Sequence, residues 1–153
     1  MLAFVELVDH GKTDVDYAIR LAKQLRAELI LFTVIDMPAM VALIGTHRAA
    51  TESRGATLTA SLVGDAKRIL QRIVDSAAAQ GVAVRGHAIV SEEVPEQILK
   101  EALVQQVDLI LIRPSKKRQG FLHLMMRSTV EEVLAAAPCS VLVVQPEGGA
   151  SAD

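Results

Sequence analysis

Short, almost continuously apolar runs alternate with longer segments whose apolar residues recur at helical spacing, and this alternation constrains the fold most strongly. The runs are too uniformly apolar for a sheet with one wet face, so most of them predict strands buried on both sides. Strands that alternate with helices predict a parallel sheet with helices on both faces. The five predicted strands are residues 1–8, 28–34, 82–90, 107–112 and 140–145.

The helical segments carry recognisable start and stop signals. Thr13 resembles a cap for the first helix, Gly81 stands where the second should stop, and Pro138 follows the last. Ser128 and Glu131 have capping-box spacing, in which each side chain accepts a hydrogen bond from the backbone N–H of the other. The predicted helices are residues 13–26, 57–79, 95–103 and 128–137.

A chain of 153 residues fits one domain with a sizeable core. We expect an α/β domain over residues 1–146 and a small, polar, frayed tail over residues 147–153. Residues 35–55 lose the periodicity and predict a long connection, within which residues 37–45 form an apolar flap.

Composition excludes several classes of protein. Aromatic residues make up 3% of the chain, and the formal net charge is -2, which argues against a nucleic-acid or anionic-membrane binder. The single cysteine, Cys139, excludes an intramolecular disulfide framework. We see no signal peptide and no apolar run of the ~20 residues that a membrane span needs, so we predict a cytoplasmic protein.

Residues 113–127 form a cationic loop with five Lys or Arg residues and no acid, between the fourth strand and the last helix. Ligands of α/β proteins bind at such places, where a strand ends and a helix begins. One interpretation is a phosphate site rebuilt from side-chain charge. The other is a solvated loop whose charges keep it soluble.

Three segments resemble the universal stress protein family: Val8-Asp9, residues 33–36 and above all residues 128–144. The resemblance covers essentially the whole chain. It implies an open five-stranded parallel sheet of order 3-2-1-4-5, similar to adenine nucleotide alpha hydrolases, with helices on both faces. It also implies a homodimer through the last strand, here Val141–Val144.

The ATP-binding members of that family carry three glycines in the loop after the fourth strand. Counting back from Ser128 puts Pro114, Lys117 and Arg127 at those positions. Backbone N–H groups must approach phosphates closely there, and proline has no N–H. The ATP cradle is therefore not carried over intact.

The resemblance still marks candidate nucleotide- or anion-binding residues. The counterparts of Asp9 and Val34 contact nucleotide in the family, although Asp9 could cap a loop and Val34 could be core. Ser128 and Thr129 follow the last glycine position, and the helix cap is the better interpretation of Ser128. The complete candidate set is Asp9, Val34, Lys116, Lys117, Arg127, Ser128 and Thr129.

No arrangement of residues predicts catalysis or a metal site. The four histidines are scattered, and no Gly-x-Ser-x-Gly elbow occurs. Glu6 lies inside the predicted first strand, where a carboxylate must be paired, lie near a wet strand end or stay protonated. Cys139 starts a strand after a helix-ending proline and is predicted to be buried. We therefore expect no enzyme and no bound metal.

The leading hypothesis is a dimeric, non-catalytic stress-response regulator with a degenerate nucleotide site, acting through ligand or protein contacts. No cofactor is expected, although binding of ATP, AMP or another phosphate ligand is kept as an alternative. One alternative is a phosphate-binding regulator that uses Lys116, Lys117, Arg118 and Arg127. Others are the cytosolic regulatory domain of a transporter and an ATP hydrolase or kinase-like enzyme.

Overall fold

The structure is a computed structural model that describes residues 1–7, 12–36, 52–114 and 128–145. In chain order it contains β1 (Leu2–Phe4), α1 (Lys12–Leu25), β2 (Leu29–Ile35), α3 (Glu52–Ala79), β3 (Val84–Val90), α4 (Val94–Val104), β4 (Leu109–Ile112), α5 (Thr129–Ala136) and β5 (Ser140–Val143). The predicted flap at 37–45, the tail at 147–153 and most of the cationic loop lie outside these ranges.

The five strands form one parallel sheet in the order β3-β2-β1-β4-β5, which confirms the predicted fold class and strand order. The central strand β1 pairs on one side with β2, Leu2 opposite Ile30, and on the other with β4, Leu2 opposite Ile110. The strand order therefore reverses across β1. The carboxyl ends of β1 and β4 define the crevice where ligands of such sheets bind.

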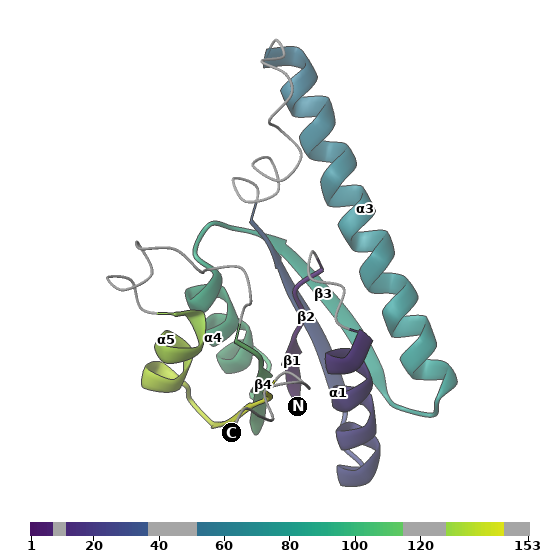
Figure 1. The fold of residues 1–153 in the computed structure, drawn as a ribbon, viewed down its shortest axis with the longest axis vertical. Coiled ribbons are helices and arrows are strands. Elements are labelled where there is room, and N and C mark those ends of the chain that lie inside the picture. The colour runs from purple at the N-terminus through teal and green to yellow at the C-terminus, as the bar shows by residue number, and fades with distance from the viewer. Residues whose placement is uncertain (8–11, 37–51, 115–127, 146–153) are drawn as a thin grey trace, which may run out of the picture.

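Helices cover both faces of the sheet, α1 and α3 on one side and α4 and α5 on the other (Figure 1). Each layer encloses a separate aliphatic core. Beneath α1 and α3 the core includes Leu29, Leu31 and Leu70. Beneath α4 and α5 it includes Leu2, Phe32, Ile98, Ile110 and Val133. Successive strand residues point to opposite faces, so each buried strand contributes to both cores.

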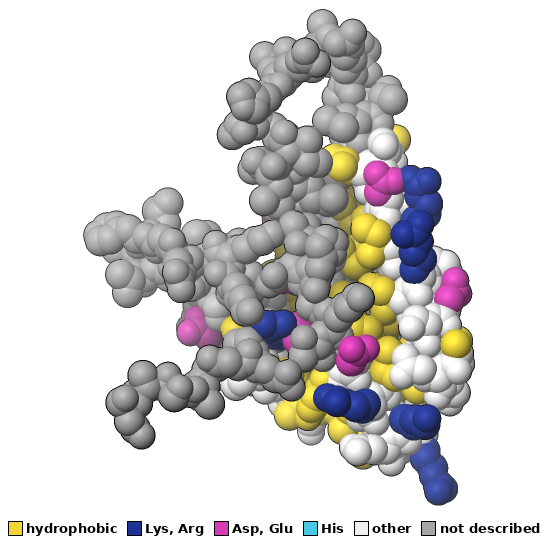
Figure 2. All heavy atoms as spheres, turned by 45° about the vertical axis from the view of Figure 1, so that its right-hand side comes forward, with side chains coloured by type: hydrophobic (Ala, Val, Ile, Leu, Met, Phe, Trp, Pro, Cys, Tyr) yellow, Lys and Arg dark blue, Asp and Glu magenta, His cyan; other side chains and the backbone are white. Residues whose placement is uncertain are grey.

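The two helix layers differ in charge. Figure 2 shows Lys and Arg side chains gathered over α3 and α1, and the exposed cations of these helices are Arg20, Lys23, Lys67, Arg68 and Arg72. The exposed acids along α4, α5 and the segments that precede α4 and β4 are Glu92, Glu93, Glu96, Asp108, Glu131 and Glu132. Helices α1 and α3 also expose Asp16, Asp65 and Asp75, and α4 exposes Lys100, so acids predominate on the α4 and α5 side while the α1 and α3 side carries both signs.

Several predicted boundaries were wrong. Strand β1 ends at Phe4, so Glu6 lies beyond the strand, half-buried, and not inside it. Helix α1 begins at Lys12, which puts the predicted cap Thr13 within its first turn. Helix α3 begins at Glu52 and not near residue 57, because backbone hydrogen bonding continues the helix upstream of its apolar face.

Candidate functional site

The carboxyl ends of β1 and β4 are bridged by an ion pair between Arg113 and Asp14. Arg113 is the first residue after β4, and Asp14 lies in the first turn of α1. The Arg113 Nη1 atom donates to the Asp14 Oδ2 atom. The two side chains are 15% and 26% exposed, so the pair is largely removed from water. The pair links the helix that follows β1 to the residue that follows β4, at the point where the strand order reverses.

The guanidinium of Arg113 is only partly used by this contact. Arginine carries five N–H donors, and the buried Nε atom has no hydrogen-bond partner among the described residues. A buried donor left unpaired costs about 1–3 kcal/mol. The described part of the crevice thus holds a cation that is anchored at one end and unsatisfied at the other.

The N-terminus of α5 is closed by its own side chains. The Ser128 Oγ atom accepts from the Glu131 backbone N–H at 3.2 Å, and the Ser128 N–H donates to Glu131 Oε2 at 2.9 Å. This confirms the predicted capping box. The Glu131 and Glu132 carboxylates also lie in the first turn, where negative charge complements the helix dipole. The protein's own acids therefore occupy the place where a bound anion would lie.

The other candidate residues are placed differently. Val34 is half-buried and packs against the core beneath α4 and α5, while its neighbour Thr33 donates its hydroxyl to the Val5 carbonyl at 2.7 Å. Thr129 is the first residue of α5 and is half-buried. The remaining candidates, Asp9, Lys116, Lys117 and Arg127, lie outside the described residues.

Sequence reasoning did not find the Arg113–Asp14 pair. It counted Arg113 only as one charge of a cationic loop and assigned no role to Asp14. A usable signal existed, because β1 and β4 are neighbours whenever the strand order is 3-2-1-4-5. An acid in the helix after one strand and an arginine directly after the other then share the same edge.

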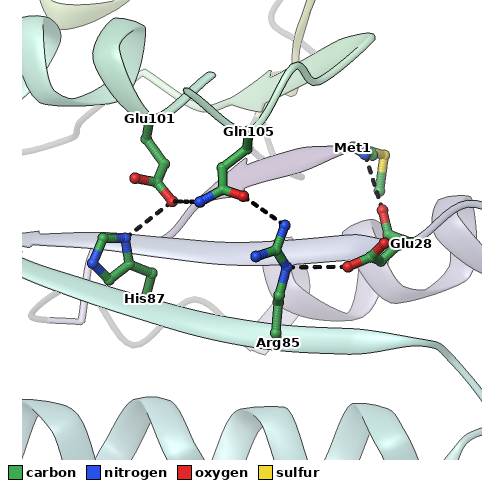
Figure 3. Close-up of polar contacts among 6 residues, drawn as sticks. All are labelled: Met1, Glu28, Arg85, His87, Glu101 and Gln105. Carbon is green, nitrogen blue, oxygen red and sulfur yellow. Dashed lines mark hydrogen bonds and ion pairs between the residues drawn. The ribbon is translucent and has the colours of Figure 1, made fainter. Parts of the chain in front are cut away.

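A second polar network lies away from the crevice, between β3 and α4 (Figure 3). The His87 Nδ1 atom is 3.0 Å from Glu101 Oε1, and the Gln105 amide donates to the same oxygen at 3.1 Å. Arg85 donates to the side chains of Gln105 at 2.7 Å and Glu28 at 3.0 Å. The network ties the edge strand β3 to α4 and satisfies Glu101, the one charged side chain among the described residues classed as buried.

Two titrating groups outside the crevice are perturbed. A hydrogen bond with Glu96, followed by repulsion from the Glu96 charge, raises the pKa of Glu93. Burial, with a smaller contribution from the charge of Asp108, raises the pKa of the Cys139 thiol. Cys139 was predicted to be buried and is half-buried. A raised pKa keeps the thiol protonated and poorly nucleophilic.

Residues 1–7, 12–36, 52–114 and 128–145 contain no cluster of three His, Cys, Asp or Glu side chains that could hold a metal ion. Among the helices described, none is both long and apolar enough to cross a bilayer.

Comparison with known proteins identifies one family. The sequence matches the model of the universal stress protein family over residues 2–145. No curated protein matches the chain. The universal stress protein UspA from Lactobacillus plantarum is 18% identical with a TM-score of 0.70, over 94% of this chain and 95% of that chain.

Two similar structures contain a nucleotide. A universal stress protein in complex with cAMP is 17% identical with a TM-score of 0.61, over 94% of each chain. The universal stress protein from Archaeoglobus fulgidus in complex with dAMP is 17% identical with a TM-score of 0.55, over 93% of this chain and 94% of that one. At these identities the similarity shows the fold alone.

Proposed function

Because the chain belongs to the universal stress protein family, we propose that it is a non-catalytic regulatory member whose nucleotide site has degenerated. One observation carries this proposal. Of the two described groups at the crevice that could receive phosphate, the Arg113 guanidinium is ion-paired with Asp14 through Nη1, and the N-terminus of α5 is capped by Ser128 and Glu131.

The backbone of the crevice supports the same proposal. Pro114 follows Arg113 and has no N–H to offer a phosphate oxygen. The N–H of Ser128 is bonded to Glu131, so it too is used. A triphosphate would have to displace Glu131 and lie close to Asp14 as well, and both steps oppose binding of a highly charged anion.

Melting curves test this proposal. Wild-type protein should show no saturable shift with ATP, AMP or cAMP, with or without magnesium, and adenosine serves as the control that lacks phosphate. A ligand at 100 times its dissociation constant would stabilise the fold by about 2.7 kcal/mol. For a chain of this size that corresponds to a rise of at least about 5 °C. A saturable rise that Asp9→Ala removes would refute the degenerate site.

A nucleotide-binding regulator is the second candidate function. The relatives solved with cAMP and dAMP favour it, together with the cationic side chain of Arg113 at the crevice. It would also use Lys116, Lys117 and Arg118, which lie outside the described residues. In that case, replacing these three residues by serine should abolish the melting shift and its dependence on salt.

We also propose that the protein forms a homodimer through residues 141–144. Strand β5 is an edge strand with apolar, half-buried residues, and Leu134 on the adjoining α5 is 52% exposed. An uncovered apolar edge of this kind invites pairing with another strand.

Light scattering at micromolar concentration should give twice the 16.4 kDa chain mass. Val141→Lys should reduce the mass toward that of the monomer, because a charge at the start of the pairing edge opposes association. Val141 also packs against the core beneath α4 and α5, so circular dichroism must show that the variant is folded. Lys100→Glu, on the exposed side of α4, is the control and should leave the dimer intact. A monomeric wild-type protein would contradict this assembly.

A further inference from the structure

We propose that the outer edge of β3 is a docking site for an extended peptide of another protein, which adds to the sheet as a further strand and places an acidic side chain beside Arg85. Strand β3 lies at the opposite edge of the sheet from β5 and away from the crevice at β1 and β4. Peptide binding at β3 is therefore independent of the nucleotide site and of the homodimer.

The backbone of β3 has an open side in the described part of the chain, where β3 pairs with β2 alone over its full length. At the start of this ladder, the Leu29 N–H donates to the Ala83 carbonyl at 2.8 Å. At its end, the Ser91 N–H donates to the Ile35 carbonyl at 3.2 Å. Backbone groups alternate in direction along a strand, so every second residue from Ala83 to Ser91 faces β2. The residues whose N–H and C=O groups point away from β2 are Val84, Gly86, Ala88 and Val90.

The side chains of β3 leave this backbone accessible. Gly86 has no side chain, and Ala88 packs against the core beneath α1 and α3. Arg85 and His87 point to the other face, where side chains of α4 and the adjoining turn hold them (Figure 3). Edge strands are commonly protected by proline, a bulge or a free lysine. Strand β3 contains no proline, and its one permanent charge, on Arg85, is engaged by Glu28 at 3.0 Å.

Helix α3 determines what can occupy this edge. A Cβ atom at Gly86 would lie 2.8 Å from Val74 Cγ2 and 3.1 Å from Leu70 Cγ, so α3 lies directly over β3. A second copy that paired its β3 antiparallel to this one would bring its own α3 over a strand ~4.8 Å away. Packed helices need about 8–10 Å between their axes. The edge therefore accepts a strand that carries no helix on that face, which a peptide of another protein provides.

Exposed side chains beside the edge indicate the chemistry of the peptide. Arg85 uses its Nε on Glu28 and its Nη2 on Gln105, and 50% of its side chain is exposed. Arginine carries five N–H donors, so a carboxylate on the added strand can accept from those that remain. Glu28 already offsets part of the charge, so one acidic residue fits better than a run of them. Val90 is 48% exposed and favours a β-branched neighbour on the peptide.

The probe is a blocked synthetic peptide as long as β3, seven residues. It is threonine throughout, except for valine at the first position and glutamate at the sixth, which lie opposite Val90 and Arg85 in an antiparallel pairing. In an otherwise identical control peptide, lysine replaces glutamate. The lysine peptide should bind at least about fivefold more weakly, since like charges directly opposite one another are destabilising. Equal affinities of the two peptides would contradict recognition of an acidic partner at Arg85.

Amide protons of the wild-type protein report where the peptide binds. Before peptide is added, the N–H groups of Gly86 and Ala88 should exchange with deuterium at least about tenfold faster than those of Arg85 and His87, which bond to β2. The glutamate peptide should shift the Gly86 and Ala88 resonances saturably and slow their exchange. Slow exchange before addition, no shift at millimolar peptide, or shifts confined to β5 would each overturn the proposal.

Substitutions on β3 test the backbone contact. Ala88→Pro removes an outward N–H, and proline is tolerated on an edge strand where its nitrogen faces solvent. This variant should lose peptide binding, whereas Ala88→Ser keeps the N–H and should bind like the wild type. Val90→Lys is a second variant, at an exposed position, where a free lysine protects the edge and should weaken binding severalfold. Circular dichroism checks that each variant is folded. Folded Ala88→Pro and Val90→Lys proteins that bind as tightly as the wild type would rule out docking at this edge.

Light scattering tests the other possible occupant, a second copy of the chain. The wild-type and Val90→Lys proteins should have the same mass, because the proposed homodimer uses the opposite edge of the sheet. A lower mass for Val90→Lys would show that the β3 edge joins copies of the chain, and the peptide would then be the wrong occupant. A melting shift with ATP would refute the degenerate nucleotide site and leave peptide binding at β3 standing.

Discussion

Ile98→Ala is expected to lower the free energy of unfolding by about 2–5 kcal/mol. Ile98 is fully buried on the inner side of α4, in the core that includes Phe32, Ile110 and Val133. Removing three carbons leaves a cavity among side chains that belong to strands and to a second helix. These neighbours cannot move into the cavity without breaking backbone pairing, so relaxation should recover little of the lost free energy of unfolding.

The matched control for Ile98→Ala is Leu103→Ala on the same helix. Leu103 is 66% exposed, and its truncation should change stability by no more than about 0.5 kcal/mol. Urea denaturation monitored by circular dichroism measures the free energy of unfolding of both variants. The slope of this free energy against urea concentration should not change. Equal losses in the two variants would mean that α4 is not held to the sheet by its inner face.

Gly86→Ala is expected to destabilise the fold by about 1–3 kcal/mol through overpacking. A Cβ atom at Gly86 would lie 2.8 Å from Val74 Cγ2 and 3.1 Å from Leu70 Cγ, both on α3. Valine is stiff about χ1, and Leu70 is almost fully buried, so neither side chain can turn away easily. The added methyl group must push α3 away from β3.

Gly64→Ala gives the control with the opposite sign. A Cβ atom at Gly64, within the same helix α3, would meet no atom within 4 Å. Alanine should therefore stabilise the protein by about 0.5–1 kcal/mol through its higher helix propensity.

Adding Val74→Ala to Gly86→Ala should recover part of the stability lost in Gly86→Ala, and the recovery is measured as a coupling free energy. Additive effects would contradict the close approach of α3 to β3.

Local signals in the sequence predicted much of this fold. Gly81, at φ +84°, ends the turn after α3, and Ser128 caps α5 as its spacing with Glu131 indicated. Both features depend on residues within a few positions of each other. The alternation of apolar runs and helical periodicity gave the correct class of sheet, because each element must bury its own face.

The missed features depend on residues far apart in the chain. Arg113 meets Asp14, and His87 of β3 meets Glu101 of α4, only after the strands have been ordered. The overlong first strand has a related cause. An apolar run shows where a strand could continue, but the point at which its pairing with β2 and β4 ends is a tertiary property.

The position of β1 also affects how the chain can acquire its structure. Leu2 pairs with Ile30 and with Ile110, so the first strand completes its hydrogen bonding only after β4 has formed. Closing so long a loop costs entropy before the contact stabilises anything, which slows the folding of proteins rich in such pairs. During synthesis from the N-terminus, the edge of β1 that pairs with β4 stays uncovered until β4 has been made. The central strand is thus the first one made and among the last to be fully enclosed.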